Sequence, residues 1–275
     1  MAKLEGWWEI ETSAGQVWSL TYPELGITRL TGSGMPSASQ ATQRTPTQHG
    51  SAWLGFALDE REILIGLLWK GKWSTCLSGR RRQVYQPFSY LAGPLTIRRI
   101  LPNQEVRELR YCRFGGGLEG DSDDQWDDTE TSAVRLVAYD PTWYDPSPHS
   151  CAVAESATIT DLVTLGDWYS YPTITIGGPC SSFELVSATT GQRLRLTYGI
   201  ADGEIATLVT NPHCLSATLG DGTDLEPYIP PGDDFGGFCL WPKPLAVTNE
   251  WVLTVAGTDA GSTFAFSWED RYQGI

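Results

Sequence analysis

Residues 171–191 read YPTITIGGPCSSFELVSATTG. An apolar strand pattern, Thr173–Ile176, leads through a Gly-Gly-Pro turn into a second pattern, Phe183–Ala188, which closes on Thr-Thr-Gly. Short strands joined by tight turns predict antiparallel β-structure. Further strand patterns follow in the same half of the chain: Arg193–Tyr198, Glu204–Val209, Leu215–Leu219, Trp251–Ala256 and Thr263–Trp268. In the last of these, three aromatic residues alternate with small or polar ones, so we expect one face to pack inward in a β-sandwich.

The other half of the chain is also rich in strand patterns. They cover Val17–Tyr22, Glu62–Trp69, Leu95–Leu101, Val106–Phe114 and Ser132–Tyr139. The nearly continuous apolar run at 62–69 is typical of a strand covered on both faces, or of a strand in an interface. Ser74 is a suitable N-cap for one helix over about 74–90. Three prolines in DPTWYDPSPHS (140–150) predict a boundary between domains 1–145 and 146–275.

A polar segment, residues 28–52, interrupts the first half. Its sequence, TRLTGSGMPSASQATQRTPTQHGSA, offers few side chains to a core. As a hairpin, at ~3.3 Å per residue, it would project about 40 Å. A domain of ~150 residues has a radius of gyration of only about 15 Å. The segment therefore predicts a protruding arm that lies on a neighbouring molecule or stays disordered.

The charge and the apolar pattern exclude some classes of ligand and location. The chain carries 33 acidic and 19 basic residues, a net charge of −14. A field of this sign repels phosphate backbones, which argues against nucleic-acid binding. No apolar run approaches the ~20 residues of a membrane span, and MAKLEGWWEIE lacks the apolar run of a signal peptide. We therefore expect synthesis in the cytoplasm and no membrane segment.

No catalytic or metal-binding constellation stands out, and no cofactor is indicated. The three histidines fall in expected loops, and the six cysteines are widely spaced, as separate thiols would be. Asp233 and Asp234 could act as the carboxylate pair of a glycosidase, but they are more simply turn formers. The weak candidates for a metal site belong to one acidic insert: Asp121, Asp123, Asp127 and Asp128. That insert lacks the glycine and glutamate of an EF-hand loop.

Aromatic residues around the start of the second domain allow sugar binding. Trp168, Tyr169 and Tyr171 are the candidate glycan contacts, since an exposed aromatic face and a few polar groups suffice for a sugar. The alternative is that these rings cover the junction of the two domains, because aromatic residues also gather at protein interfaces.

Several segments, taken in order, carry a family resemblance. The polar arm ends in PTQHG (46–50), and LDEREILI (58–65) sets Arg61 before an apolar strand. Arg80–Arg82 lie in the expected helix, and AGPL (92–95) follows it. The strongest phrase is VRLVAYDPTWYDP (134–146). In order and spacing these segments resemble the distal tail protein family of siphophages. That family commonly carries a Tyr-Pro-x-Ile-x-Ile strand and a Thr-Thr-Gly hairpin, as residues 171–191 do.

The resemblance implies a mainly β fold: a sandwich or split-barrel domain with the helix and the arm, then a galectin-like sandwich. It implies a structural, non-enzymatic virion protein at the tail tip, forming a homohexameric ring that lines the DNA channel. Implied partners are the tail tube protein, a tail-associated hub or fibre, and receptor-binding proteins, with DNA only in transit. The implied subunit contacts are Arg44, Pro46, Gln48, Arg61, Ile63 and Ile65. A carbohydrate-binding host-recognition protein is the alternative function, and a glycoside hydrolase is the third.

Overall fold

The computed structural model describes residues 6–20, 25–44, 49, 51–70, 86–91, 93–118, 129–160, 162–242 and 250–275. Strands dominate this part, and its helical elements are single 3₁₀ turns at Glu226–Tyr228 and Phe235–Gly237, so the predicted mainly β class is confirmed. Most of the helix expected over about 74–90, residues 74–85, lies outside the described residues, while 86–91 form turns and bends. No helix in the described ranges is long and apolar enough to cross a membrane.

The chain divides into two compact units. Unit 1 contains Met1–Tyr144 together with Gln273–Ile275, and unit 2 contains Asp145–Tyr272. The chain therefore leaves unit 1 after Tyr144 and returns to it after Tyr272. The sequence had suggested that residues 273–275 belong to the second domain.

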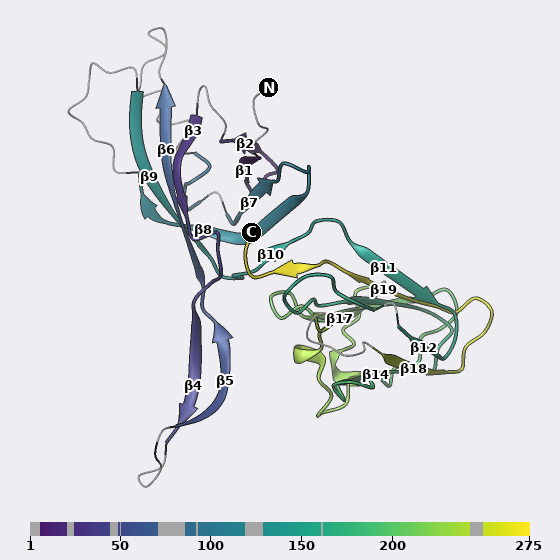
Figure 1. Ribbon diagram of the computed structural model, residues 1–275. Helices are drawn as coiled ribbons and strands as arrows, with labels where there is room; N and C mark the ends of the chain where they lie inside the picture. Colours follow the sequence, from purple (N-terminus) through teal and green to yellow (C-terminus); the bar gives the residue numbers. More distant parts are fainter. Residues whose placement is uncertain are drawn as a thin grey trace. The chain divides into compact units, whose positions relative to one another are not determined.

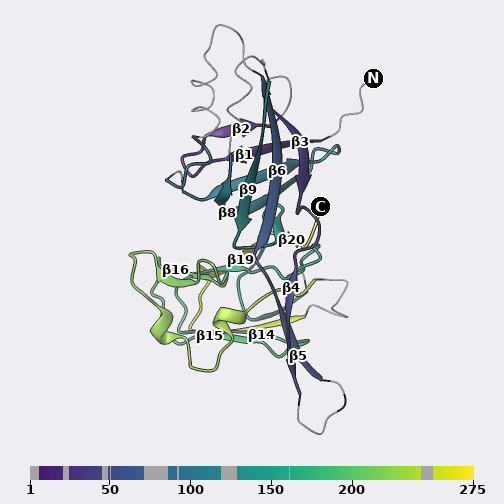
Figure 2. The ribbon, with the colours of Figure 1, turned by 90° about the vertical axis from the view of Figure 1, so that its left-hand side faces the viewer.

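Unit 1 is built on one antiparallel sheet with the strand order β2-β1-β7-β8-β9-β6-β3. Its strands are β1 Trp7–Glu11, β2 Val17–Ser19, β3 Leu25–Thr31, β6 Arg61–Lys70, β7 Leu95–Ile100, β8 Val106–Gly117 and β9 Thr129–Ala138. A short strand, β10 (Trp143–Tyr144), also pairs with β8. Figures 1 and 2 show the sheet bending, so that β1 and β7 lie across from β3 and β6.

The alternation of β6 shows where the core of unit 1 lies. Ile63, Ile65 and Leu67 are fully buried, whereas Leu64, on the opposite face of the strand, is 45% exposed. Since side chains alternate along a strand, this pattern buries one face of β6 only. The apolar run at 62–69 is therefore covered on one side within this chain, not on both.

Unit 2 is a sandwich of two antiparallel sheets around one apolar core, with strand orders β11-β19-β13-β16-β17 and β12-β18-β14-β15. Its strands are β11 His149–Val153, β12 Ala157–Ile159, β13 Thr173–Gly177, β14 Ser182–Ser187, β15 Arg193–Leu196, β16 Ile205–Val209, β17 Ser216–Leu219, β18 Trp251–Ala256 and β19 Thr263–Trp268. The short strand β20 (Arg271–Tyr272) belongs to neither of these two sheets. The aromatic face predicted for β19 is confirmed, because Phe264, Phe266 and Trp268 are all buried.

Candidate functional site

The arm is a hairpin of β4 (Ala38–Gln43) and β5 (Ala52–Leu58), which among the described strands pair only with each other. Figure 1 shows the hairpin beyond the ends of β3 and β6, and every residue of β4 is exposed. The arm lies further along the chain than the predicted 28–52. Residues 28–31 instead complete β3, which pairs with β6 and has apolar side chains at Ile27 and Leu30. The second leg continues past Ala52 to Leu58, although its residues are apolar.

A β-bulge puts two aromatic side chains on one face of the arm. Trp53 pairs with Thr42 and Phe56 with Gln40, which leaves Leu54 as the extra residue. Faces alternate with a period of two, so residues 40 and 42 share a face, and their partners share the matching face of β5. The two rings stack with centroids 6.2 Å apart and planes at 27°. We call Trp53 and Phe56 the arm's aromatic pair.

The aromatic pair is open to solvent. Trp53 is 62% exposed and Phe56 48%, and the neighbouring Leu54 is 62% exposed. Apolar side chains scattered singly over a surface need no explanation, but several gathered on a narrow hairpin indicate an interaction surface. The arm therefore presents a contact surface that its own chain leaves largely uncovered.

At the root of the arm, one buried arginine binds several carbonyl groups. Arg61 is only 2% exposed. Its Nε donates to the carbonyl of Pro141 at 2.6 Å, and Nη1 donates to those of Gly32 at 2.7 Å and Gly34. Nη2 donates to the carbonyl of Gln273. The planar fork of a guanidinium suits such a set of acceptors, which a single ammonium group cannot reach together.

Arg61 remains charged at neutral pH. Burial lowers the pKa of Arg61 to about 10, and the negative charge of Asp140 opposes this shift. Cys112 is a neutral thiol at physiological pH, because burial raises its pKa. The face of the Trp143 ring, 5.7 Å from the guanidinium carbon, adds a further favourable contact to the cation.

The structure divides the predicted subunit contacts into three groups. Arg44 is exposed at the end of β4. Pro46 and Gln48 lie outside the described residues. Arg61, Ile63 and Ile65 are inside unit 1, with 2%, 0% and 0% of their surface exposed, because they form the root and the core face of β6. Side chains buried in this way offer no surface to a neighbouring subunit, so the proposed interface does not include Arg61, Ile63 or Ile65.

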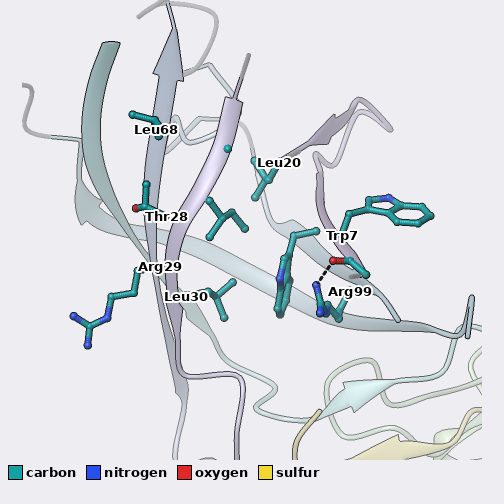
Figure 3. A pocket seen from close by; sticks show the side chains of 11 residues that line it. Trp7, Leu20, Thr28, Arg29, Leu30, Leu68 and Arg99 are labelled. Carbon is teal, nitrogen blue, oxygen red and sulfur yellow. Dashed lines mark hydrogen bonds between the residues drawn. The ribbon is translucent and has the colours of Figure 1, made fainter. Parts of the chain in front are cut away.

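A groove of about 470 Å³ lies between β3 and the start of β1. Its apolar lining includes Trp8, Leu20, Ile27 and Leu30. Figure 3 shows Leu20 and Leu30 pointing into it and Arg29 pointing away. Arg99 closes one end: its Nη1 donates to the carbonyl of Gly6 at 2.8 Å, and its guanidinium carbon lies 4.8 Å from the centroid of the Trp8 ring. Among the described strands β3 pairs only with β6, so its other edge faces this groove unpaired.

No protein-family model matches the chain, and no curated protein sequence matches it. Solved structures match nearly all of it. The crystal structure of SPP1 Dit, a paradigm of the hub adsorption apparatus in Gram-positive infecting phages, gives a TM-score of 0.66 at 17% identity, covering 96% of this chain and 98% of that chain. The chain has the fold of a Dit protein. The structure of the phage P2 baseplate in its activated conformation with calcium gives a TM-score of 0.56 at 6% identity, covering 98% of this chain and 99% of that chain. The same baseplate with strontium gives a TM-score of 0.52 at 7% identity, covering 95% of this chain and 97% of that chain.

The sandwich of this Dit fold uses its acidic loop to cover a sheet edge. Asp233, whose side chain is fully buried, accepts hydrogen bonds from the backbone N–H of Arg195 at 2.9 Å and from the side chains of Arg195 and Arg193. Asp234 accepts one from the backbone N–H of Arg193 at 3.0 Å. Burial opposes ionisation of Asp233, but the hydrogen bonds outweigh it and hold the pKa of this carboxyl below its ordinary value. The two carboxylates therefore complete the edge of β15 rather than form a hydrolytic pair.

His149 begins β11, although the sequence predicts it in a loop; its Nε2 lies 2.9 Å from Oδ2 of Asp270 and its ring stacks on Trp268. Ser170, whose side chain is buried, donates to Oγ1 of Thr164 at 2.8 Å. Oγ1 of Thr164 in turn donates to Asp270. These groups thus form internal hydrogen bonds of unit 2.

Other predicted chemistry can be placed only in part. In the described ranges no group of three or more His, Cys, Asp or Glu side chains is arranged to hold a metal ion. The candidate metal ligands Asp121, Asp123, Asp127 and Asp128 lie outside those ranges. The described cysteines are free thiols, of which Cys214 is exposed.

The candidate glycan contacts take part in two different sets of ring contacts in unit 2. Trp168 and Tyr169 lie with ring centroids 5.0 Å apart, and Tyr169 meets Trp241 edge-on at 5.3 Å. Tyr171 instead lies under the guanidinium carbon of Arg271 at 4.8 Å. Sequence reasoning missed Trp241, which is 70 positions or more from its partners and has no nearby aromatic pattern to mark it. It also missed the arm's aromatic pair.

Proposed function

We propose that this chain is a structural, non-enzymatic subunit of a phage tail tip, and that copies of it join through the arm into a ring. The observation that carries the proposal is the arm's aromatic pair, 62% and 48% exposed on a hairpin that pairs with no other described strand. Removing such apolar surface from water is favourable, and a second copy can supply the cover. The Dit fold supports a tail-tip setting.

The groove of unit 1 is the proposed acceptor for the neighbour's arm. It combines an apolar lining with the unpaired edge of β3, so an arriving strand gains both apolar contact and main-chain hydrogen bonds. Arm and groove are different surfaces, which makes the contact heterologous. Heterologous contacts close into a ring or continue as a filament. The family resemblance favours a closed, hexameric ring.

In this proposal the ring lies at the tail tip of the virion and joins the tail tube protein to a hub or fibre and to receptor-binding proteins. The subunits are synthesised in the host cytoplasm. DNA passes through without specific binding, and the net charge of −14 favours release because it repels the phosphate backbone.

The test exploits the two different surfaces. Trp53→Asp disables the arm and keeps the groove, whereas Leu30→Asp disables the groove and keeps the arm. By mass photometry we expect wild type to form rings, each variant alone to be monomeric, and an equal mixture of the two to give dimers through one intact arm and one intact groove. Tyr228→Asp is the matched control, because Tyr228 is an exposed aromatic residue of unit 2 that packs edge-on against Tyr198.

The outcomes separate the two parts of the proposal. Wild type that stays monomeric up to the highest concentrations would contradict ring assembly. Rings that persist in Trp53→Asp would contradict the role of the arm. Rings that form in Leu30→Asp would contradict the role of the groove.

Glycan binding by unit 2 is a second candidate function. The cluster of Trp168, Tyr169 and Trp241 favours it, because the three rings are continuous and each is partly exposed. A glycan array probed with wild type, Trp241→Ala and the control Tyr228→Ala tests it. Binding that is lost only in Trp241→Ala would support this function, and no binding by wild type would exclude it for the glycans on the array.

A further inference from the structure

Both legs of the arm reach unit 1 at the side chain of Arg61. The first leg leaves β3 through residues 32–37, which have no regular secondary structure, and Arg61 holds the carbonyls of Gly32 and Gly34 in this link. The second leg runs from β5 through Asp59 and Glu60 into Arg61, the first residue of β6. The legs are also tied to each other, since the backbone N–H of Asp59 donates to the carbonyl of Ser37 at 2.9 Å.

The same guanidinium holds the two segments of unit 1 that adjoin unit 2. It binds the carbonyl of Pro141, shortly before the chain leaves unit 1, and that of Gln273, the first residue after its return. These acceptors are 80 and 212 positions away from Arg61. Arg61 therefore connects the root of the arm to both crossings of the chain.

A second set of contacts joins the returning segment to the arm's root without Arg61. The backbone N–H of Ile275 donates to the carbonyl of Ser33 at 3.3 Å. Gly274 packs so closely that an added Cβ would lie 3.2 Å from the carbonyl carbon of Gly34 and 3.4 Å from the nitrogen of Met35. Gly274 and Ile275 thus contact the link between β3 and β4 directly.

We propose that Arg61 and residues 273–275 form a clamp that sets the direction in which the arm leaves unit 1. The inference rests on the proposed function of the arm in assembly, for which the arm's direction matters. Residues 32–37 have no regular secondary structure that could fix the direction of the arm, so the clamp must fix it.

The clamp should hold the arm in the direction that binding to a second copy requires. If its loss leaves the arm correctly directed for one-tenth of the time, the apparent association of two copies weakens about ten-fold, with no change in the contacting surfaces. Pre-organisation of this kind alters affinity because less freedom is lost on binding.

Two variants disturb the clamp from opposite sides. Arg61→Lys keeps the positive charge and loses the planar fork that reaches several carbonyls at once. Gly274→Val forces side-chain atoms against Gly34 and Met35, and it leaves the buried cation in place. Gly199→Val is the matched control, because an added Cβ at Gly199 meets nothing within 4 Å.

The measurement is a distance distribution by double electron–electron resonance, with non-natural spin-label residues at Gln43 on the arm and Asn103 in the exposed turn after β7. In dilute, monomeric protein we expect a narrow distribution for wild type and Gly199→Val, and a distribution at least about two-fold broader for the clamp variants. Circular dichroism establishes that each variant is folded. If Arg61→Lys does not fold, Gly274→Val decides the matter. A narrow, unshifted distribution in a folded Gly274→Val protein would overturn the clamp.

Assembly is measured separately by sedimentation, so that failure of the clamp is distinguishable from failure of the proposed function. Wild type that forms no oligomer contradicts the proposed function, whatever the distance distributions show. Wild-type rings together with unchanged distributions contradict the clamp alone.

Discussion

Truncation of Trp53 to alanine should weaken self-association about 30- to 150-fold, which corresponds to about 2–3 kcal/mol. A tryptophan side chain offers roughly 250 Å² to burial. Since Trp53 is 62% exposed, roughly 150 Å² of this remains for a neighbour to cover. At ~25 cal/mol per Å², that burial contributes at most about 4 kcal/mol. Alanine retains a small part of the area, and fixing the ring costs about 0.5–1.5 kcal/mol. Stacking on Phe56 already restricts the ring, which keeps this cost near its lower limit.

Sedimentation velocity over a wide concentration range measures the effect as a shift in the midpoint of assembly. Phe56→Ala should cause a smaller shift, because Phe56 is a smaller side chain and is 48% exposed. Tyr228→Ala, in unit 2, should cause none. A shift of less than about three-fold for a folded Trp53→Ala protein, or a larger shift for Phe56→Ala, would refute burial of the aromatic pair in a subunit contact.

Three further predictions concern stability and reactivity. Asp233→Asn should lower the free energy of unfolding by about 1–2 kcal/mol at neutral pH, because hydrogen bonds to a charged acceptor are lost. The pKa of Asp233 in the folded protein lies below its ordinary value, so the extra stability of wild type over the variant should shrink as the pH falls through that pKa. A stability difference that calorimetry finds to be independent of pH would contradict this. Gly55→Ala should weaken assembly about ten-fold, because the φ of +150° at Gly55 disfavours a side chain, and a shift of the bulge would separate the rings of Trp53 and Phe56. Deletion of Leu54, the extra residue of the bulge, keeps both rings on one face and should retain assembly in the same sedimentation assay. Iodoacetamide should modify Cys214 well before Cys112, whose burial raises its thiol pKa, and equal rates by mass spectrometry would contradict the buried position.

Local patterns were sufficient to predict most strands of the sandwich, but not β11 (His149–Val153) or β12 (Ala157–Ile159), where the sequence analysis expected no strand. The two strands read from residues 171–191 correspond to β13 (Thr173–Gly177) and β14 (Ser182–Ser187), and β19 has the bounds that its alternation indicated. These strands obey one strong rule, in which a buried face alternates with an exposed one. A rule of period two is visible in the sequence without knowledge of the partner strand.

The arm escaped prediction in detail because a bulge breaks that rule. Trp53 and Phe56 are three positions apart, a spacing that places side chains on opposite faces of a regular strand. Only the pairing with Thr42 and Gln40 shows that they share a face. Arg61 was identified from the family resemblance, but its acceptors come from distant segments such as Gln273, and no local pattern encodes such a contact.

The carbonyls of Pro141 and Gln273 are hydrogen bonded to one guanidinium, so the points where the chain departs for residues 145–272 and comes back are neighbours within unit 1. Segments that begin and end at adjacent points can be lengthened, shortened or exchanged while the host domain keeps its fold. The sandwich could therefore be exchanged for a different module while unit 1 keeps its fold.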